Sequence, residues 1–380
     1  MQTWGYDPST SQLRNEIISE CGGNVFRVML NICGADQTFA AARPYVNIYG
    51  RNVAVFIKET YGLDLQGGDM QVIALPMQFG WSSSSMRHIQ PMKIRKGVAI
   101  VEANACLQKI IDAPPEMCTV WCHNVAEGIC QACDPDSEYI FTHHVLQGDD
   151  RCRAVVKKKS DKLSPEQLKR LELNDPFQKI VQLDFPQVVT DIIMTTVAFN
   201  SFNIYTAVCV GMIGSQRTEE LGAPLARMTG IKLGNKLMDG SSGKGDLNTI
   251  KNKMDFLNTL LAQRGEPSVM TDSSIQKEIV ECPFKNGVPE QCKHWEGVFS
   301  GVCEAINPDY EFAYDRMMSK GDSSCHWTIR KKADSSNQMS KSGGVTDDPL
   351  KRLTNKFIDG EITKEEYEEK MAIIKKHHPR

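Results

Sequence analysis

The sequence predicts an α+β protein made of two tandem copies of a helix-plus-antiparallel-sheet domain, followed by a short helical hairpin. Two observations carry this prediction: the chain repeats itself, and both halves show the same order of helix, strand and turn signals. The composition agrees, because a chain of 380 residues with 41% apolar and 24% charged residues is neither disordered nor fibrous.

The internal repeat is clearest near the end of each half, where GDDRC at 148–152 recurs as GDSSC at 321–325, 173 residues later. Matches upstream keep the same order while the offset drifts to 180, as loop insertions and deletions between two copies would produce. Val101-Glu102 is matched in this way with Val280-Glu281, and Pro44 and Gly50 are matched with Pro224 and Gly230.

The repeat sets the expected domain boundaries. Copy one is expected at 1–159, copy two at 160–333, a flexible polar linker at 334–346 and a helical hairpin at 347–376. Between the copies, KKKSDKLSPEQLKRL is typical of a charged linker leading into a helix, which Ser164 and Gln167 can begin with a capping box.

Within each copy the signals come in one order. We expect an amphipathic helix after Pro44 and after Pro224, then an apolar strand at 96–106 and 274–284. A second helix follows, which in copy one begins at Pro114-Pro115. A hairpin closes each copy, with strands at 138–146 and 152–158 in copy one and at 310–318 and 325–331 in copy two. The apolar stretch 185–214 is interrupted by polar residues, so we expect a pair of core helices and no membrane span.

Charge and cysteine content exclude several classes of protein. Lys plus Arg number 44 against 47 Asp plus Glu, so nothing attracts the whole chain to nucleic acid or to an anionic membrane. Thirteen cysteines are an odd number, and the N-terminus lacks a basic segment followed by an apolar run. We therefore expect reduced thiols in a cytoplasmic protein.

Several of these cysteines share helix faces. At 100° per residue, Cys118, Cys122 and Cys133 lie within about 60° of one another, and Cys292 and Cys303 lie about 20° apart. The first three are candidate ligands of zinc or another thiolate-bound metal, with Cys106, Cys152 or His123 as a fourth. The alternative is that these cysteines are small apolar core residues.

The cysteines and glycines of copy two also carry a family resemblance. Glu281-Cys282-Pro283-Phe284, Cys292, Gly297 and Gly301, then Gly321-Asp322 and Cys325 resemble the 4-vinyl reductase (4VR) small-molecule-binding domain and the L-2-amino-thiazoline-4-carboxylic acid hydrolase family. Copy one departs from the pattern, because Cys106 follows Glu102 by four residues instead of one. The resemblance implies a small molecule or metal-containing cofactor bound between helices and sheet, with ligand-binding candidates at Cys292, Cys303, Glu102, Cys106 and Cys152.

The hydrolase side of the resemblance implies an enzyme acting on non-peptide C–N bonds. Its catalytic candidates are Glu281, Cys282, Asp322 and Cys325: a thiolate nucleophile needs a nearby base, and a carboxylate can take a proton. For Gly321-Asp322 the alternative is turn chemistry, with aspartate accepting from backbone amides.

The C-terminal run DDPLKRLTNKFIDGEITKEEYEEKMAIIKK resembles the SHOCT domain, a short helical hairpin. About thirty residues cannot bury much core alone. A third expectation is therefore an assembly scaffold that self-associates through this tail.

Overall fold

The computed structural model describes residues 8–61, 73, 77, 86–89, 92–95, 97–106, 109, 113–171, 179–181, 187–238 and 244–332. All of these except residue 332 belong to one compact unit, which contains both copies. The SHOCT-like segment lies outside the described residues, so its expected hairpin and self-association stay predictions.

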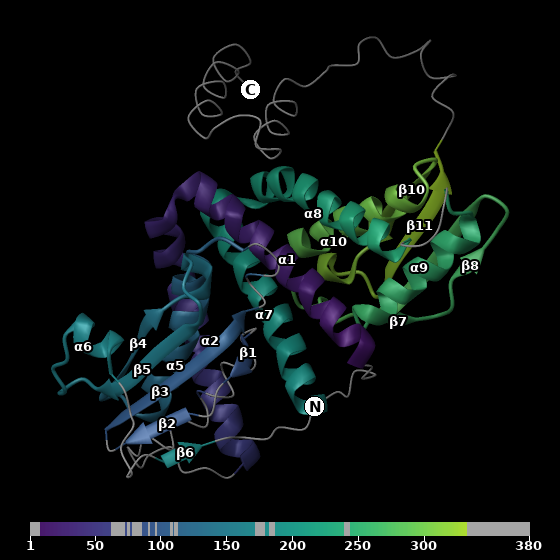
Figure 1. Cartoon of the computed structure of the whole chain (residues 1–380). Helices are drawn as coiled ribbons and strands as arrows, with labels where there is room; N and C mark the ends of the chain where they lie inside the picture. The colour runs from purple at the N-terminus through teal and green to yellow at the C-terminus, as the bar shows by residue number, and fades with distance from the viewer. Residues whose placement is uncertain are drawn as a thin grey trace, which may run out of the picture. The chain divides into compact units, whose positions relative to one another are not determined.

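Copy one places helices on one antiparallel sheet (Figure 1). Two long helices come first, α1 (Pro8–Cys33) and α2 (Ala35–Tyr61), separated by Gly34 in a left-handed conformation. The sheet has the order β4-β5-β3-β2-β6, and β1 also pairs with β3. Its strands are β1 (Met86–Ile89), β2 (Met92–Arg95), β3 (Val98–Cys106), β4 (Ser137–His143), β5 (Cys152–Lys158) and β6 (Lys179–Val181). The π-helix η1 (Cys118–His123) and helix α5 (Asn124–Cys133) lie between β3 and β4. The 3₁₀ turn η2 (Val145–Gln147) follows β4.

Copy two repeats this arrangement with a different set of edge strands. Helices α7 (Gln187–Ile213) and α8 (Ser215–Leu237) are separated by Gly214, which matches Gly34 at an offset of 180 and is also left-handed. Helix α9 (Leu247–Leu260) precedes a sheet of order β10-β11-β9-β7, with β8 paired to β9. The remaining elements are β7 (Arg264–Gly265), β8 (Val269–Met270), β9 (Ser274–Glu281), α10 (Pro289–Ile306), β10 (Tyr310–Arg316), η3 (Met318–Lys320) and β11 (Cys325–Lys331).

The closing hairpins match residue for residue, which confirms that both halves contain the same helix-plus-sheet module. Tyr139 pairs with Val156 in copy one as Phe312 pairs with Ile329 in copy two, each 173 residues apart. Both hairpins also shift register at the equivalent place, between 141 and 143 and between 314 and 316. A shared irregularity of this kind indicates a common backbone rather than a generic hairpin.

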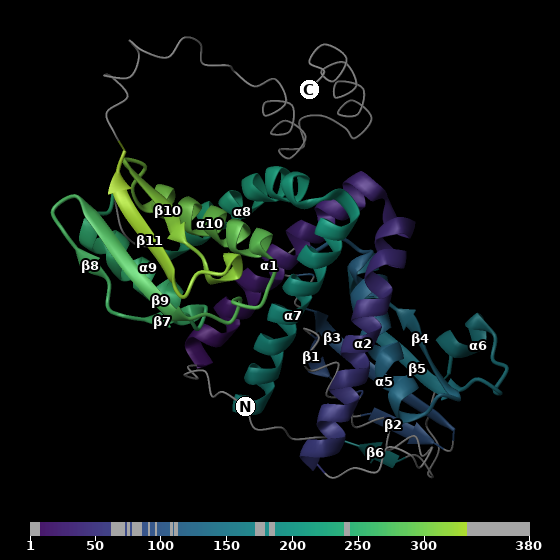
Figure 2. The same cartoon turned by 180° about the vertical axis from the view of Figure 1, so that it is seen from behind.

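The two copies pack through α1 and α7 around a local two-fold relation (Figure 2). Gly22 lies against Phe202, its own counterpart at the offset of 180. Reciprocal polar contacts flank this point. Thr229 donates to Glu20 (3.2 Å), and the equivalent residues across the axis, Tyr49 and Asn200, are also hydrogen-bonded. Such self-paired contacts are those of a symmetric dimer, here within one chain.

The structure changes two details of the sequence expectations and confirms a third. The helices expected after Pro44 and Pro224 begin well before them, because packing of the whole helix outweighs the single backbone hydrogen bond that a proline removes. The apolar stretch 185–214 contains one long helix, α7, instead of a pair. Helix α6 (Pro165–Lys169) begins with the expected Ser164–Gln167 capping box.

The segment between the copies adds to the sheet of copy one. Leu168 of α6 packs on Ile100 and Val155, and β6 pairs antiparallel with β2. The described parts of this segment therefore pack with copy one. Within the described residues, every helix is too short or too polar to cross a lipid bilayer.

Candidate thiol site

Three different elements of copy two bring cysteines together. Cys282 follows the last residue of β9, Cys292 stands in the first turn of α10, and Cys325 begins β11. Cys282 and Cys325 are hydrogen-bonded through their side chains, and both are close enough to Cys292 to interact electrostatically. All three are buried and unoxidised. We call this set the copy-two thiol cluster.

The environment of this cluster makes one thiol acidic. The hydrogen bond from Cys282, together with one from the backbone N–H of Met318 (3.3 Å), lowers the pKa of Cys325 to about 7. The same hydrogen bond and burial raise the pKa of Cys282, since that thiol keeps the proton of the pair. Burial raises the pKa of Cys292 to about 11. Cys325 is therefore the thiolate of this set near neutral pH.

Two further residues border the copy-two cluster. Tyr314 of β10 lies beside all three thiols, and burial raises the pKa of its hydroxyl. The Gln263 amide donates a long hydrogen bond (3.9 Å) to the sulfur of Cys282. The sequence analysis predicted neither residue. There was a signal for Tyr314: side chains two residues apart on a strand share a face, and Phe312 on the same strand points inward.

Copy one assembles the same three thiols and adds a fourth. Cys106 ends β3, Cys118 begins η1 and Cys152 begins β5, and these thiols interact electrostatically with one another and with Cys122. Burial raises the pKa of Cys118 to about 12 and that of Cys152 to about 11. We call these four cysteines the copy-one thiol cluster. Unlike Cys325, Cys118, Cys122 and Cys152 are thiols at neutral pH.

The sheet registers correct the sequence match between the two copies. Cys152 pairs with Ala103 and Cys325 pairs with Ile279, so β3 and β9 correspond at an offset of 176 rather than 179. At this offset Cys106 matches Cys282, and the counterpart of Glu102 is Glu278 instead of Glu281. In this match each copy has a cysteine four residues after a glutamate, so the difference in cysteine spacing that we inferred for copy one disappears. Cys106 still lacks the flanking Glu, Pro and Phe of copy two.

The predicted carboxylates are not brought to the thiols. Glu102 pairs with Arg153 across the sheet. Because Arg153 is the neighbour of Cys152 on β5, Glu102 lies on the face of the sheet opposite to the Cys152 side chain. There it forms an ion pair with the buried guanidinium of Arg153 (3.2 Å). Glu281 is more than half exposed and faces Arg264 at 3.7 Å. Neither carboxylate is placed to act as a base for Cys152 or Cys282.

The fourth thiol of copy one comes from a one-residue insertion. Cys118 and Cys292 correspond at an offset of 174, whereas Val125 and Val298, farther along the same helices, correspond at 173. Copy one therefore has one extra residue in this stretch, and the π-helix η1 accommodates it. A π-bulge is the usual way for a helix to absorb an insertion, and it is common at functional sites. Here it brings Cys122 to the cluster.

Two predicted ligands lie elsewhere because an angular match ignores the rise along the helix. Cys133 is fifteen residues after Cys118, on the order of 20 Å along the axis, and its thiol lies beside Cys130. Cys303 is eleven residues after Cys292, roughly 16 Å, and is buried in the core. The predicted set of Cys118, Cys122 and Cys133 is thus replaced by Cys106, Cys118, Cys122 and Cys152.

The predicted catalytic Asp322 supports the backbone of the hairpin. Its carboxylate accepts from the backbone N–H of Met317 (2.8 Å), just as Asp149 accepts from His144 (2.6 Å) in copy one. The preceding glycines, Gly148 and Gly321, both have positive φ. These contacts are the turn chemistry that we set beside the catalytic interpretation.

Among the described residues, no group of three or more His, Cys, Asp or Glu side chains is placed so that it could hold a metal ion. No family model matches the chain, and neither a curated protein nor a solved structure does. The thiol clusters are therefore interpreted from their own geometry.

Proposed function

We propose that this protein binds a small thiophilic ligand, a soft metal ion such as zinc or a cofactor containing one, at its thiol clusters. One observation carries the proposal: the same three elements bring three thiols together in both copies. Packing alone does not require this, because the two copies otherwise exchange core residues freely, as where Cys209 takes the place of Met29.

The donor type supports a soft metal. Thiolates in sets of three or four are preferred zinc ligands, and binding displaces their protons. Since the thiols are not spaced to hold an ion as they stand, the ligand must draw them together. Cys292 is placed for such a movement, because it lies in the first turn of α10 directly after the loop that follows β9. The resemblance to 4VR small-molecule-binding domains points to the same kind of site.

Cobalt binding tests this proposal directly. Co²⁺ added without oxygen to the reduced full-length protein is expected to give the thiolate-to-cobalt absorption of a sulfur-rich site, and Zn²⁺ is expected to displace it. The variants Cys118→Ser and Cys292→Ser should each remove the contribution of one copy. The matched controls are Cys130→Ser and Cys303→Ser, buried cysteines on the same helices that should leave the absorption unchanged. Equal spectra in all four variants would refute the proposal.

The lowered pKa of Cys325 supports a second candidate, hydrolysis of a non-peptide C–N bond. A thiolate at neutral pH can attack an electrophilic ring carbon, and the neighbouring Cys282 thiol can protonate the ring nitrogen. Water then releases the opened product, so that the net reaction adds one water across the C–N bond. This route uses two copy-two thiols and needs no part of Glu281.

Turnover of L-2-amino-thiazoline-4-carboxylate tests the second candidate. Cys325→Ser and Cys282→Ala should abolish turnover, whereas Glu281→Gln should retain it, since that carboxylate is exposed and paired with Arg264. An inactive parent protein, or a Cys325→Ser variant with full activity, would remove the candidate.

A further inference from the structure

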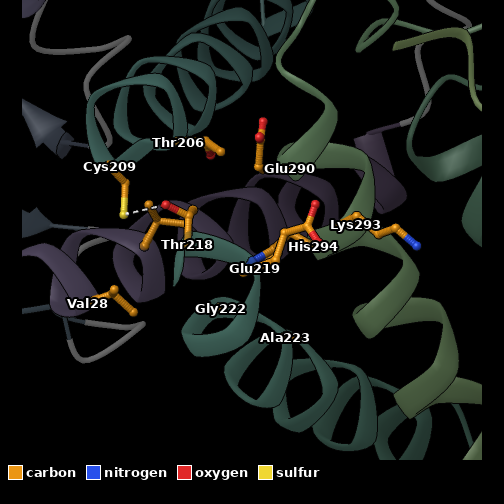
Figure 3. A pocket seen from close by; sticks show the side chains of 11 residues that line it. Val28, Thr206, Cys209, Thr218, Glu219, Gly222, Ala223, Glu290, Lys293 and His294 are labelled. Atoms are coloured by element: carbon orange, nitrogen blue, oxygen red, sulfur yellow. Dashed lines mark hydrogen bonds between the residues drawn. The ribbon is translucent and has the colours of Figure 1, made fainter. Parts of the chain in front are cut away.

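A small pocket, lined by none of the clustered thiols, lies where helices α1, α7, α8 and α10 meet (Figure 3). Its enclosed part has room for about one water molecule, and it opens to solvent. Its walls combine apolar side chains with hydroxyl, carboxylate and imidazole groups. The residues that matter below are Val25, Thr206, Thr218, Glu219, Glu290 and His294.

The equivalent place on the other side of the local two-fold axis is filled. There Tyr205 stands for Val25, and its ring contacts that of Trp121 at 5.6 Å. Phe26, the counterpart of Thr206, packs on Tyr205 at 5.2 Å. Large apolar side chains in one half are thus replaced by smaller or polar ones in the other. This replacement creates the pocket.

His294 lines the pocket with one of its ring nitrogens unpaired by any described residue. The side chain is 5% exposed, and its Nε2 has no hydrogen-bond partner among the described residues. One face of the ring is fixed by an edge contact with Phe202 at 5.2 Å. A neutral imidazole ring carries one lone pair, which can accept a hydrogen bond. A buried ring nitrogen without a partner is unfavourable unless a ligand supplies one.

The remaining polar groups present acceptors. The hydroxyls of Thr206 and Thr218 donate to the carbonyl oxygens of Phe202 and Gly214 (both 2.8 Å), so they offer lone pairs to the pocket. Glu219 and Glu290 add two carboxylates, and neither takes part in an ion pair recorded in the described part of the chain. Lys293 does not neutralise them, because its Nζ is bound to Glu296 at 2.6 Å.

We propose that this pocket binds the ammonium head of a small primary amine, with His294, the threonine hydroxyls and the two glutamates as acceptors. An ammonium group is close to a water molecule in size, donates three hydrogen bonds and is attracted by the carboxylates. Val25 and Val28 beside it suit a short alkyl substituent directed toward the opening. None of the pocket residues belongs to a thiol cluster, so this proposal can be tested independently of the proposed function.

Calorimetric titration of the full-length protein with methylammonium and ethylammonium chloride tests this assignment. Saturable binding at one site per chain is expected, whereas sodium chloride, tetramethylammonium chloride and sodium acetate should give none. Tetramethylammonium has the charge without the hydrogen-bond donors, and acetate has the opposite charge. Binding of these control ions with equal strength, or no binding of either amine, would overturn the proposal.

Variants locate the site. Glu219→Gln and Glu290→Gln, and His294→Phe, should each weaken amine binding at least tenfold. Gly222→Ala serves as a second, milder variant, since its methyl group would stand at an ordinary 3.5 Å from His294 Nδ1 and narrow the pocket. Copy one already has alanine at this position, Ala42. The control is Glu304→Gln, a carboxylate on α10 that pairs with Arg227 outside the pocket. Unchanged affinity in all pocket variants would refute the site.

Discussion

Gly50 of α2 lies directly against the backbone of Val125 of α5, so closely that a Cβ at Gly50 would stand 2.1 Å from the Val125 carbonyl oxygen. In copy two, Gly230 of α8 has the same relation to Val298 of α10, with a Cβ distance of 2.0 Å. These helix crossings hold the helix that carries Cys118 or Cys292 against the rest of its copy.

Replacing either crossing glycine should therefore be costly. Gly50→Ala and Gly230→Ala force two helices apart, and we expect each to lower the free energy of unfolding by about 3 kcal/mol or more. The control is Gly211→Ala in α7, where no atom lies within 4 Å and alanine is the better helix former. It should be neutral or stabilising by about 0.5–1 kcal/mol. Urea denaturation of the three variants measures this, and a loss at Gly211 as large as at Gly50 would contradict it.

Cys325 should be more reactive than three other clustered thiols, Cys118, Cys152 and Cys292. With a pKa of about 7 it is half ionised near neutral pH, whereas burial raises the pKa of Cys118, Cys152 and Cys292 to about 11 or 12. Brief treatment with iodoacetamide at pH 7 should label Cys325 before these three, as read by peptide mass spectrometry.

The hydrogen bond from the Cys282 thiol is the main cause of the expected reactivity of Cys325. Cys282→Ala removes the hydrogen bond that stabilises the Cys325 thiolate, so the midpoint of its alkylation rate should move above pH 7. Cys303→Ala is the control and should leave the midpoint in place. An unmoved midpoint in Cys282→Ala would show that the pair does not set the pKa.

Variants of Asp322 can distinguish a structural role of this residue from a catalytic one. Asp322→Ala removes the acceptor for the Met317 N–H, and we expect a loss of about 1–2 kcal/mol in unfolding free energy. Asp322→Asn keeps an oxygen acceptor and should recover most of that loss. Asp149→Ala should behave in the same way in copy one. If Asp322→Asn folds with full stability yet loses turnover of the thiazoline substrate, the aspartate has a chemical role as well.

The sequence allowed the repeated module and its closing hairpin to be predicted, because turn residues and alternating strands are local signals. The thiol clusters could be predicted only in part. Which cysteines meet depends on strand register and on the π-helix at Cys118–His123, and neither is encoded in a fixed residue spacing. The assumption of an ideal helix therefore led us to place Cys133 in one ligand set with Cys118. The sequence match led us to predict Glu281 as the base for Cys282.

The pocket at His294 was out of reach for a different reason. It exists because residues of α1 and α7 are smaller or more polar than their counterparts across the two-fold axis, and that comparison requires the pairing of α1 with α7. In the sequence, His294 showed only as a histidine within a helix.

His294 should make the stability of the protein depend on pH. Its folded-state pKa is about 4, below the value of about 6.5 expected in an unfolded chain, so between these values the unfolded state binds the proton more readily. This contribution is complete above about pH 6.5 and is lost as the pH falls toward 4, by at most roughly 3 kcal/mol. Between pH 7 and pH 4, the unfolding free energy of His294→Phe should fall less than that of the parent protein. The difference between the two falls should be a large part of the histidine contribution. Glu219, Glu290 and Lys293 line the same pocket and are present in both proteins, so the difference between the two pH profiles isolates the histidine. Parallel profiles would mean that the ring is hydrated or paired in solution, and that the pocket does not keep it neutral.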